Sequence, residues 1–422
     1  MAWKHESHSH WNGYDSGDGR RASNGMDINR ETRKLFEENR RITDGHQYTV
    51  PSGDHYPYQW LWDSCFHAIV LARYDVEAAK AEIQSLLSKQ FSNGLVPHII
   101  YWTPGILHLF RWGTDGTSSL TQPPMLAYAA WEIHRREPDT SFLASIFPAL
   151  VAYYNYLLSE RDPHGHHLAS IISPDESGED NSPRFDIPLG VPPSVSLKDH
   201  LAKRTELVDK NRECNFDAGR CMRDFFWVKD VLFNSVLAEN LRVLAKIAAY
   251  LKRDEYESSF KRDADAVASA MRERMFEDGV YWSTMGADFT KLKVATWAHF
   301  VPLFAGLYTK EEAEAVVSKH LKDPDTFAAP FGIRTTSIQE MSYRPDAEDF
   351  SWRGPVWIGA HWFIYHGLVR YGFAEEAADI RKKSIALLER SGFRECFNPE
   401  TGGGIGAHNF TWGALVLDMM EE

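Results

Sequence analysis

The sequence predicts an all-α fold, an (α/α)6 barrel whose long loops form the mouth of a site. About twelve segments have helical periodicity, whereas the alternation typical of strands is scarce. Apolar segments alternate with amphipathic ones, as an inner ring of fully buried helices inside an outer ring of half-buried helices would require. An open helical solenoid, in which helical hairpins stack without closing, is the alternative architecture.

Residues 1–26 are rich in His, Gly, Ser and Asp without a period, so we expect an N-terminal arm followed by a single domain over residues 27–422. The first helix is expected at residues 29–41 with Asn29 as its candidate cap. Asp75 is expected to cap a later helix, and Gly372 to end another. Further helices are predicted at about residues 121–136, 139–161, 227–251, 253–276, 289–307 and 408–421.

Residues 91–120 and 162–226 lack helical periodicity and are rich in Gly, Pro, Asp, Ser and His. Loops of this length in a compact domain are usually functional or disordered. Both contain aromatic and apolar residues, so we expect them to be ordered over one mouth of the barrel.

The net charge of −13 argues against nucleic acid or an anionic membrane as a partner, because both need basic patches. No run of about 18 apolar residues is found, and the N-terminus lacks the apolar core of a signal peptide. A cytoplasmic protein is therefore expected, and the sequence leaves a homo-oligomer open. The four cysteines have no zinc-like spacing and are interpreted as reduced thiols. They are Cys65, Cys214, Cys221 and Cys396.

Five carboxylates crowd into residues 173–186, between Pro174 and Pro183 or next to them. A metal site, a general acid with a raised pKa, and a solvated acidic turn are three interpretations of this loop. The spacing is not that of an EF-hand, although calcium stays open, and no metal or cofactor is predicted. The carboxylates are Asp175, Glu176, Glu179, Asp180 and Asp186.

Three further segments combine aromatic and polar residues. Residues 56–63 hold two tyrosines and two tryptophans, with Asp63 as either a sugar ligand or a helix cap. Residues 349–357 hold two tryptophans and Arg353, which is as well explained by an ion pair with Asp349 as by substrate binding. Residues 394–412 offer Glu395 and Glu400 as a base, beside glycines that permit tight backbone turns. A phosphate-binding loop is disfavoured there, because no Lys-Ser/Thr ending or preceding strand is present.

Two opposed carboxylates ringed by tryptophans suit glycoside hydrolysis. One acid protonates the leaving oxygen, and for inversion a base roughly 6.5–9.5 Å away activates water on the opposite face of the sugar. Aromatic rings suit the apolar face of a sugar.

The segments at residues 56–63, 176–183, 350–357 and 395–412 together resemble glycoside hydrolase family 63, in the family's order. The likeness is nearest to its short bacterial and plant members, the mannosylglycerate and glucosylglycerate hydrolases. It implies an (α/α)6 barrel and an inverting α-glycosidase that acts on a small soluble glycoside. The resemblance puts the general acid at Asp180 and the general base at Glu395. It also implies a sugar site lined by Tyr56, Trp60, Trp62, Asp63, Gln122, Trp352 and Trp357.

A glycosylglycerate substrate would need a cation for its carboxylate, and arginine is the natural choice. The candidates in the second long loop are Arg184, Arg220 and Arg223, of which Arg220 is included in the predicted substrate site.

Two other classes of function stay open at this point. A sugar epimerase or isomerase on the same barrel would use histidine bases, with His98, His361 and His408 available. A non-catalytic sugar-binding protein would keep the tryptophans without needing two opposed carboxylates. Within the glycosidases, an α-glucosidase on short oligosaccharides is a further alternative.

Overall fold

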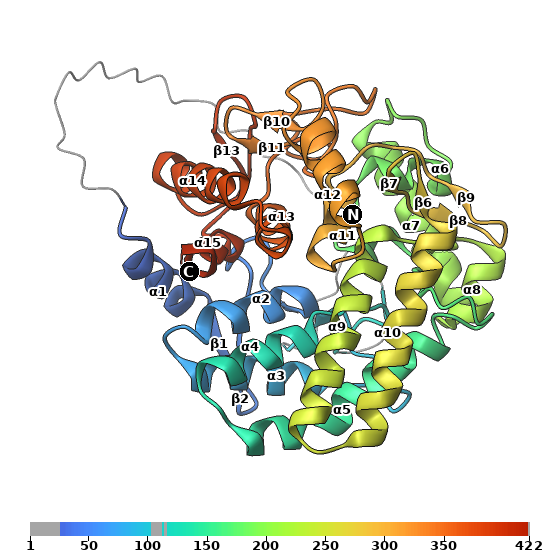
Figure 1. Cartoon of the computed structure of the whole chain (residues 1–422), viewed down its shortest axis with the longest axis vertical. Coiled ribbons are helices and arrows are strands. Elements are labelled where there is room, and N and C mark those ends of the chain that lie inside the picture. The colour runs from blue at the N-terminus through green and yellow to red at the C-terminus, as the bar shows by residue number, and fades with distance from the viewer. Residues whose placement is uncertain (1–25, 103–111, 114–115, 421–422) are drawn as a thin grey trace, which may run out of the picture.

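The computed structural model describes residues 26–102, 112–113 and 116–420, and it is mostly helical (Figure 1). Apart from Met26, the predicted N-terminal arm lies outside the described residues. The α-helices are α1 Ile28–Asn39, α2 Leu61–Leu71, α3 Val76–Leu87, α4 Leu126–Arg136, α5 Thr140–Ser159, α6 Asp186–Leu189, α7 Leu197–Glu213, α8 Ala218–Asp224, α9 Val231–Tyr250, α10 Asp254–Arg274, α11 Val301–Phe304, α12 Lys310–Val316, α13 Ile358–Tyr371, α14 Ala374–Ser391 and α15 Leu415–Met420. The 3-10 turns are η1 Pro174–Ser177, η2 Pro183–Phe185, η3 Trp297–Phe300 and η5 Thr411–Ala414, and η4 Val317–Leu321 is a π-helical turn.

Six of the described helices contact one another in a closed circuit. The order is α2, α4, α9, α11, α13, α15 and back to α2. In Figure 1 these helices surround the middle of the view, and α3, α5, α10 and α14 lie outside them. The core sits within and just outside this circuit, where the apolar side chains of facing helices interlock.

The helices of the circuit are buried more completely than those outside it, as the alternation in sequence predicts. Every residue of α2 is buried, and so are most residues of α9, whereas α10 buries only one apolar stripe. Asp230 caps α9 by accepting a hydrogen bond from the Phe233 N–H at 3.1 Å. The helix α10 lies beside α9 (Figure 1).

The described part of the chain is mostly helical, as expected, and it also contains short strands that pair in six small sheets. Most strands are two residues long, too short to show the alternation by which strands are recognised. The pairs are β1 Arg40–Thr43 with β2 His46–Thr49, β3 Gln59–Trp60 with β4 Ile99–Ile100, β5 Val228–Lys229 with β8 Thr284–Met285 and β8 with β9 Thr290–Lys291, β6 Phe276–Glu277 with β7 Val280–Tyr281, β10 Ala328–Ala329 with β11 Gly332–Ile333, and β12 Arg394–Phe397 with β13 Gly404–His408, all antiparallel.

The predicted caps are confirmed in two cases of three. Asp75 caps α3 by accepting from the Ala78 N–H at 3.0 Å, and Gly372 ends α13 in the left-handed conformation. The first helix is capped by Asp27 instead of Asn29. The helix expected at residues 289–307 is wrong over most of its length, because only η3 and the four-residue α11 form there.

The second long segment, residues 162–226, is not a plain loop, because it contains α6, α7 and α8. A disulfide joins Cys214 at the end of α7 to Cys221 in α8, so the prediction of four reduced thiols is wrong for this pair. The two cysteines are seven positions apart, and the turn between the helices brings their Cα atoms within 5.8 Å. Cys65 and Cys396 are free and buried.

Among the described helices, α5 alone is long and apolar enough to cross a membrane by length and composition. Half of its apolar stretch is buried inside the protein, against α3, α4 and α9. The same composition is expected of a core helix.

Candidate active site

One cavity of about 550 Å³ brings together segments that are far apart in the sequence. Its wall includes nine of the ten side chains predicted for the site. They are Tyr56, Trp60, Trp62, Asp63, Gln122, Asp180, Trp352, Trp357 and Glu395.

The acidic loop is held together by arginines. Each of its five carboxylates accepts from a guanidinium, and four of the five are buried. Pairing explains how so many carboxylates coexist, because a buried charge is tolerated when it is paired and hydrogen-bonded. The pairs are Glu176 with Arg161, Glu179 with Arg184, Asp186 with Arg353, and both Asp175 and Asp180 with Arg204. Among the described residues, no group of three or more His, Cys, Asp or Glu side chains could hold a metal ion.

Asp180 differs from the other carboxylates of the loop, because 36% of its side chain is exposed to the cavity. Its Oδ2 lies 2.6 Å from Nη1 of Arg204 on α7. Partial removal from water raises the pKa of Asp180, and the positive charge of Arg204 opposes the rise. A carboxyl with a raised pKa that opens to a cavity can donate a proton to a ligand there.

Glu395 reaches the cavity from β12, in a hairpin with β13. Its Oε1 accepts from the Tyr56 hydroxyl at 2.8 Å, and its Oε2 accepts from the Ala407 N–H at 2.9 Å. Burial raises the pKa of Glu395, while these two donors oppose the rise. The negative charge of Asp180 adds to it, so the two carboxylates interact electrostatically across the cavity.

Gly406 on β13 lies directly against the Glu395 carboxylate. A Cβ added there would come within 2.4 Å of Oε2, and the φ of +69° disfavours any other residue. One glycine of this segment therefore makes room for the carboxylate.

Aromatic rings form the rest of the wall. The rings of Trp352 and Trp357 stack with centroids 4.2 Å apart, and Trp412 packs edge-on against Trp357 and Trp62. Gly178 permits Trp62 to lie under the acidic loop, because an added Cβ would approach its ring to 2.2 Å. The wall is thus a rigid apolar surface beside the two carboxylates, as the apolar face of a sugar requires.

Asp63 and Gln122 complete the predicted set. Asp63 lies in the first turn of α2, where its side chain accepts from Trp412 Nε1 at 2.7 Å and does not cap the helix. Burial raises the pKa of Asp63 to about 6. The Gln122 side-chain oxygen accepts from the Trp62 N–H at 3.3 Å.

The sequence model of the mannosylglycerate hydrolase MGH1-like glycoside hydrolase domain matches residues 56–413. The chain belongs to this family. The resemblance predicted from the four segments is therefore confirmed, and the chain is a glycoside hydrolase of family 63.

Relatives in this family are named for two related compounds. Mannosylglycerate hydrolase of Rubrobacter radiotolerans is 32% identical over 89% of this chain and 93% of its own length. Glucosylglycerate hydrolase of Mycolicibacterium hassiacum is 29% identical over 86% of this chain and 92% of its own. The family 63 mannosylglycerate hydrolase of Thermus thermophilus in complex with Tris and D-glycerate superposes with a TM-score of 0.84, at 30% identity over 93% of this chain and 99% of that one. A second structure of that enzyme is a complex with glucose.

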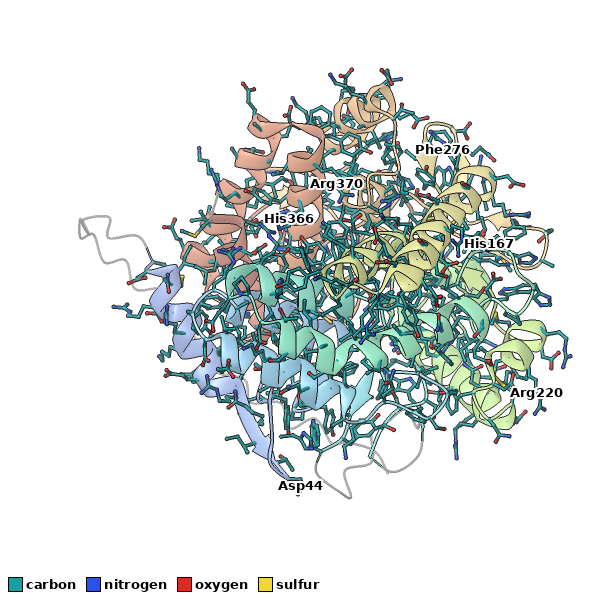
Figure 2. All side chains as sticks on the ribbon, turned by 60° about the horizontal axis from the view of Figure 1, so that its bottom comes forward. Asp44, His167, Arg220, Phe276, His366 and Arg370 are labelled. Atoms are coloured by element: carbon teal, nitrogen blue, oxygen red, sulfur yellow. A yellow bond between two sulfur atoms is a disulfide. The ribbon has the colours of Figure 1, made fainter. Side chains whose placement is uncertain are left out.

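Arg220 is the one predicted site residue that does not line the cavity. It lies on α8 and is exposed at the edge of the molecule (Figure 2). Arg184 is buried on Glu179 and Asp230, and Arg223 pairs with Asp224 at the surface. These arginines are therefore engaged elsewhere or too far from the cavity.

Among the described residues, the arginine that lines the cavity is Arg204, which the sequence analysis missed. It lies on α7, a helix placed within the segment interpreted as a loop. The available signal was Ser196, whose hydroxyl caps α7 by accepting from the Asp199 N–H at 3.1 Å. Most side chains of α7 are polar, so no apolar period indicated the helix.

Two other pairings correct the sequence analysis. Arg353 donates to Asp186 from both terminal nitrogens of its guanidinium, at 2.5 and 2.9 Å, and Asp349 is not its partner. Glu400, the rival base, pairs with Arg334 at 2.6 Å and does not line the cavity.

The three histidines considered for an isomerase lie off the cavity wall. His98 is buried, with its Nδ1 2.6 Å from the Ser118 hydroxyl oxygen. His361 is also buried, with its Nδ1 2.8 Å from the Ser384 hydroxyl oxygen. His408 is exposed on β13. In the described part of the chain, no histidine of this set is placed to move a proton within the cavity.

Proposed function

We propose that the protein is an inverting α-glycosidase that hydrolyses a small α-mannoside or α-glucoside of glycerate to the sugar and glycerate. The observation that carries the proposal is the presence of Asp180 and Glu395 on one cavity wall ringed by tryptophans. Membership of the family and the relatives named for mannosylglycerate and glucosylglycerate support the choice of substrate.

In this proposal Asp180 is the general acid. Its proton passes to the glycosidic oxygen as the bond from that oxygen to the anomeric carbon breaks. Glu395 is the general base, which takes a proton from the water that attacks the anomeric carbon on the opposite face. Tyr56 and the Ala407 N–H favour the ionised form of Glu395, which a base requires.

The aromatic wall and the polar groups would bind different parts of the substrate. Trp352 and Trp357 offer flat apolar surfaces to the sugar ring. Asp63 would accept hydrogen bonds from sugar hydroxyls. Arg204 would receive the carboxylate of the aglycone, which the sequence analysis assigned to a different arginine.

We also propose that the circuit of six helices, with the amphipathic helices outside it, is an (α/α)6 barrel. The contacts from α2 round to α15 and back to α2 support a closed ring in preference to an open solenoid. In this arrangement the loops over one end of the ring carry both carboxylates.

A panel of substrates tests the proposal. Mannosylglycerate, glucosylglycerate, the corresponding glycosylglycerols and short α-glucans are incubated with the purified protein, and released sugar and glycerate are quantified. We expect the glycosylglycerates to be hydrolysed fastest. Faster cleavage of the α-glucans, or conversion of a sugar without release of an aglycone, would contradict the proposal.

A further inference from the structure

Arg204 is the centre of an asymmetric pair of carboxylates. Its Nη1 lies 2.6 Å from Asp180, and its Nη2 donates to Asp175. The Asp175 side chain is 5% exposed and also accepts from the Ser173 hydroxyl at 2.5 Å, whereas Asp180 is 36% exposed to the cavity. Asp175 is thus a fixed anchor for the guanidinium, and Asp180 is the partner that a ligand can replace.

The contact with Arg204 works against the proposed role of Asp180. A general acid must hold a proton when the substrate is bound, but a guanidinium at hydrogen-bond distance favours the ionised carboxylate. Burial outweighs that effect, so the pKa of Asp180 is raised overall, but Arg204 keeps it lower than burial alone would. A ligand that weakened the contact between Arg204 and Asp180 would therefore raise the pKa of Asp180 further and favour the protonated acid.

The proposed substrate carries a group that can do this. In a 2-O-glycosylglycerate, the carbon that holds the glycosidic oxygen also holds the carboxylate. When Asp180 reaches the glycosidic oxygen, the substrate carboxylate must lie in the immediate neighbourhood of Asp180, and hence of Arg204. Among the described residues that line the cavity, Arg204 is the only arginine or lysine.

The wall beside Arg204 also has an unsatisfied polar group. His200 lies one helical turn earlier on α7 and lines the cavity, and its side chain is almost fully buried. Its Nε2 has no hydrogen-bond partner among the described residues. Burial, together with the charge of Arg204, lowers the pKa of His200 to about 3, so the ring is neutral. This wall is therefore able to hydrogen-bond a polar ligand without an additional charge.

We propose that the substrate's own carboxylate takes Arg204 away from Asp180, so that Asp180 acquires the proton that it then donates, and that this exchange restricts fast hydrolysis to glycosides with an anionic aglycone. The inference rests on the proposed function. A guanidinium has five N–H donors, so Arg204 can stay on Asp175 while Nη1 changes partner. Arg204 is thus a positioning and specificity residue that acts through Asp180.

The proton balance is as follows. Asp180 takes a proton from solvent when Arg204 turns to the substrate carboxylate. That proton passes to the glycosidic oxygen, the bond to the anomeric carbon breaks, and water adds while its proton goes to Glu395. Departure of glycerate lets Arg204 return to Asp180, and Glu395 returns its proton to solvent.

Other charged or titratable groups line the cavity with Asp180, and the test must account for them. They are Asp175 on η1, His200 on α7, His55, Tyr56 and Tyr58 before β3, Asp63 on α2, Glu395 on β12, and Glu348 and Asp349 in the loop before α13. All of these are unchanged between two substrates that differ only in the aglycone. A comparison of substrates therefore isolates the effect of the substrate carboxylate.

The experiment compares the glycerate glycoside with its glyceramide analogue, in which a neutral amide of similar size replaces the carboxylate. Both the α-mannosyl and the α-glucosyl forms are used, and kcat is measured as a function of pH. The high-pH limb reports loss of the proton from the general acid. We expect this limb to lie about 1–3 pH units higher for the glycerate than for the glyceramide glycoside, because one opposite charge is neutralised at hydrogen-bond distance.

Two variants of the protein test the role of Arg204 further. Arg204→Met should move the high-pH limb for the glyceramide glycoside upward, because the cation that favours ionised Asp180 is gone. Arg212→Met is the matched control, since Arg212 lies on the same helix and pairs with Asp209 at the surface. It should leave both limbs in place. Circular dichroism checks the fold of each variant, and the substrate comparison in the unchanged protein stands alone if Arg204→Met does not fold.

Equal high-pH limbs for the two substrates in the unchanged protein would overturn the inference while leaving the proposed function intact. Absence of hydrolysis for all glycerate glycosides would overturn the proposed function, and this inference with it.

Discussion

Asp180 and Glu395 face the same cavity, yet the chain holds the two carboxylates in different ways. Asp180 lies in a loop whose carboxylates are all bound by arginines, and its own partner is the cation Arg204. Glu395 lies on a hairpin and accepts from neutral donors, the Tyr56 hydroxyl and the Ala407 N–H.

The difference shows what each role requires. A base must be ionised before the substrate binds, and two neutral donors stabilise its charge without depending on the ligand. An acid must be protonated when the substrate is in place, so a partner that the ligand can displace is more useful than a fixed one. Four of the five carboxylates in the acidic loop are buried in ion pairs, and Asp180 is the one whose side chain is substantially exposed.

Removal of either carboxylate is expected to cause the largest loss of activity. Asp180→Asn and Glu395→Gln should each lower kcat by about 10²- to 10⁴-fold, because general acid and base catalysis contribute on that order. Steady-state assays on glycosylglycerates measure the loss, and circular dichroism checks the fold. Glu400→Gln is the matched control, since Glu400 pairs with Arg334 away from the cavity. Activity near that of the unchanged protein in either of the first two variants would refute its role.

The ion pair between Arg353 and Asp186 supports the loop that carries the proposed acid, and it can be removed without changing a residue that lines the cavity. Arg353→Met leaves Asp186 buried without its cation, which should cost about 3–5 kcal/mol of unfolding free energy. The pKa of Asp186 is raised to about 6 by burial, with Arg353 opposing the rise, so loss of Arg353 raises it further. A raised pKa in the folded state contributes stability at low pH that is lost as the pH rises through it. The loss should therefore be larger at pH 8 than at pH 5.

Urea denaturation at the two pH values measures this effect. The double variant Arg353→Met with Asp186→Leu should recover much of the stability, because a buried ion pair can be replaced by apolar side chains. A loss below about 1 kcal/mol at pH 8 would show that the pair does not support the loop.

The position of Glu395, the proposed base, depends on the space that a glycine leaves beside it. Gly406→Ala should displace Glu395, since the new Cβ would lie 2.4 Å from its Oε2 at a φ of +69°. Misplacement of a catalytic group by about 1 Å can cost on the order of 10²-fold in kcat. Gly403→Ala is the control, because its added Cβ would meet only the Thr401 hydroxyl, at 3.3 Å. Equal kcat values for the two variants would argue against this role for Gly406.

The smallest effect is expected from Tyr56→Phe. The Tyr56 hydroxyl donates to ionised Glu395 and opposes the rise of its pKa, so its removal should raise that pKa. Because a base must be ionised, the low-pH limb of the kcat profile should move to higher pH. A fall in kcat of about 10-fold is expected at neutral pH, which is the effect of one hydrogen bond to a charged group. An unchanged low-pH limb would mean that Tyr56 does not tune the base.

Nine of the ten predicted site residues line the cavity, and all of these except Gln122 stand in segments rich in aromatic residues and carboxylates. Long apolar helices such as α9 were predicted for a similar reason, since their periodicity extends over many turns. Arg204 was missed because α7 lacks an apolar stripe, and its role depends on proximity to Asp175 and Asp180 in the folded chain.

The sequence also could not predict which carboxylate a buried arginine pairs with. Arg353 stands close to Asp349 in the chain but binds Asp186, which is 167 residues away. Only the fold decides which carboxylate a buried guanidinium meets. The disulfide between Cys214 and Cys221 depends in the same way on a turn between two helices that the sequence pattern did not indicate.

The stereochemistry of the first product shows whether Asp180 and Glu395 act as acid and base on opposite faces of one sugar. Proton NMR follows hydrolysis of the α-linked substrate before the product mutarotates. We expect the β-anomer to appear first, because water attacks opposite the leaving group. First appearance of the α-anomer would contradict these roles, because retention requires Glu395 to be a nucleophile and not a base.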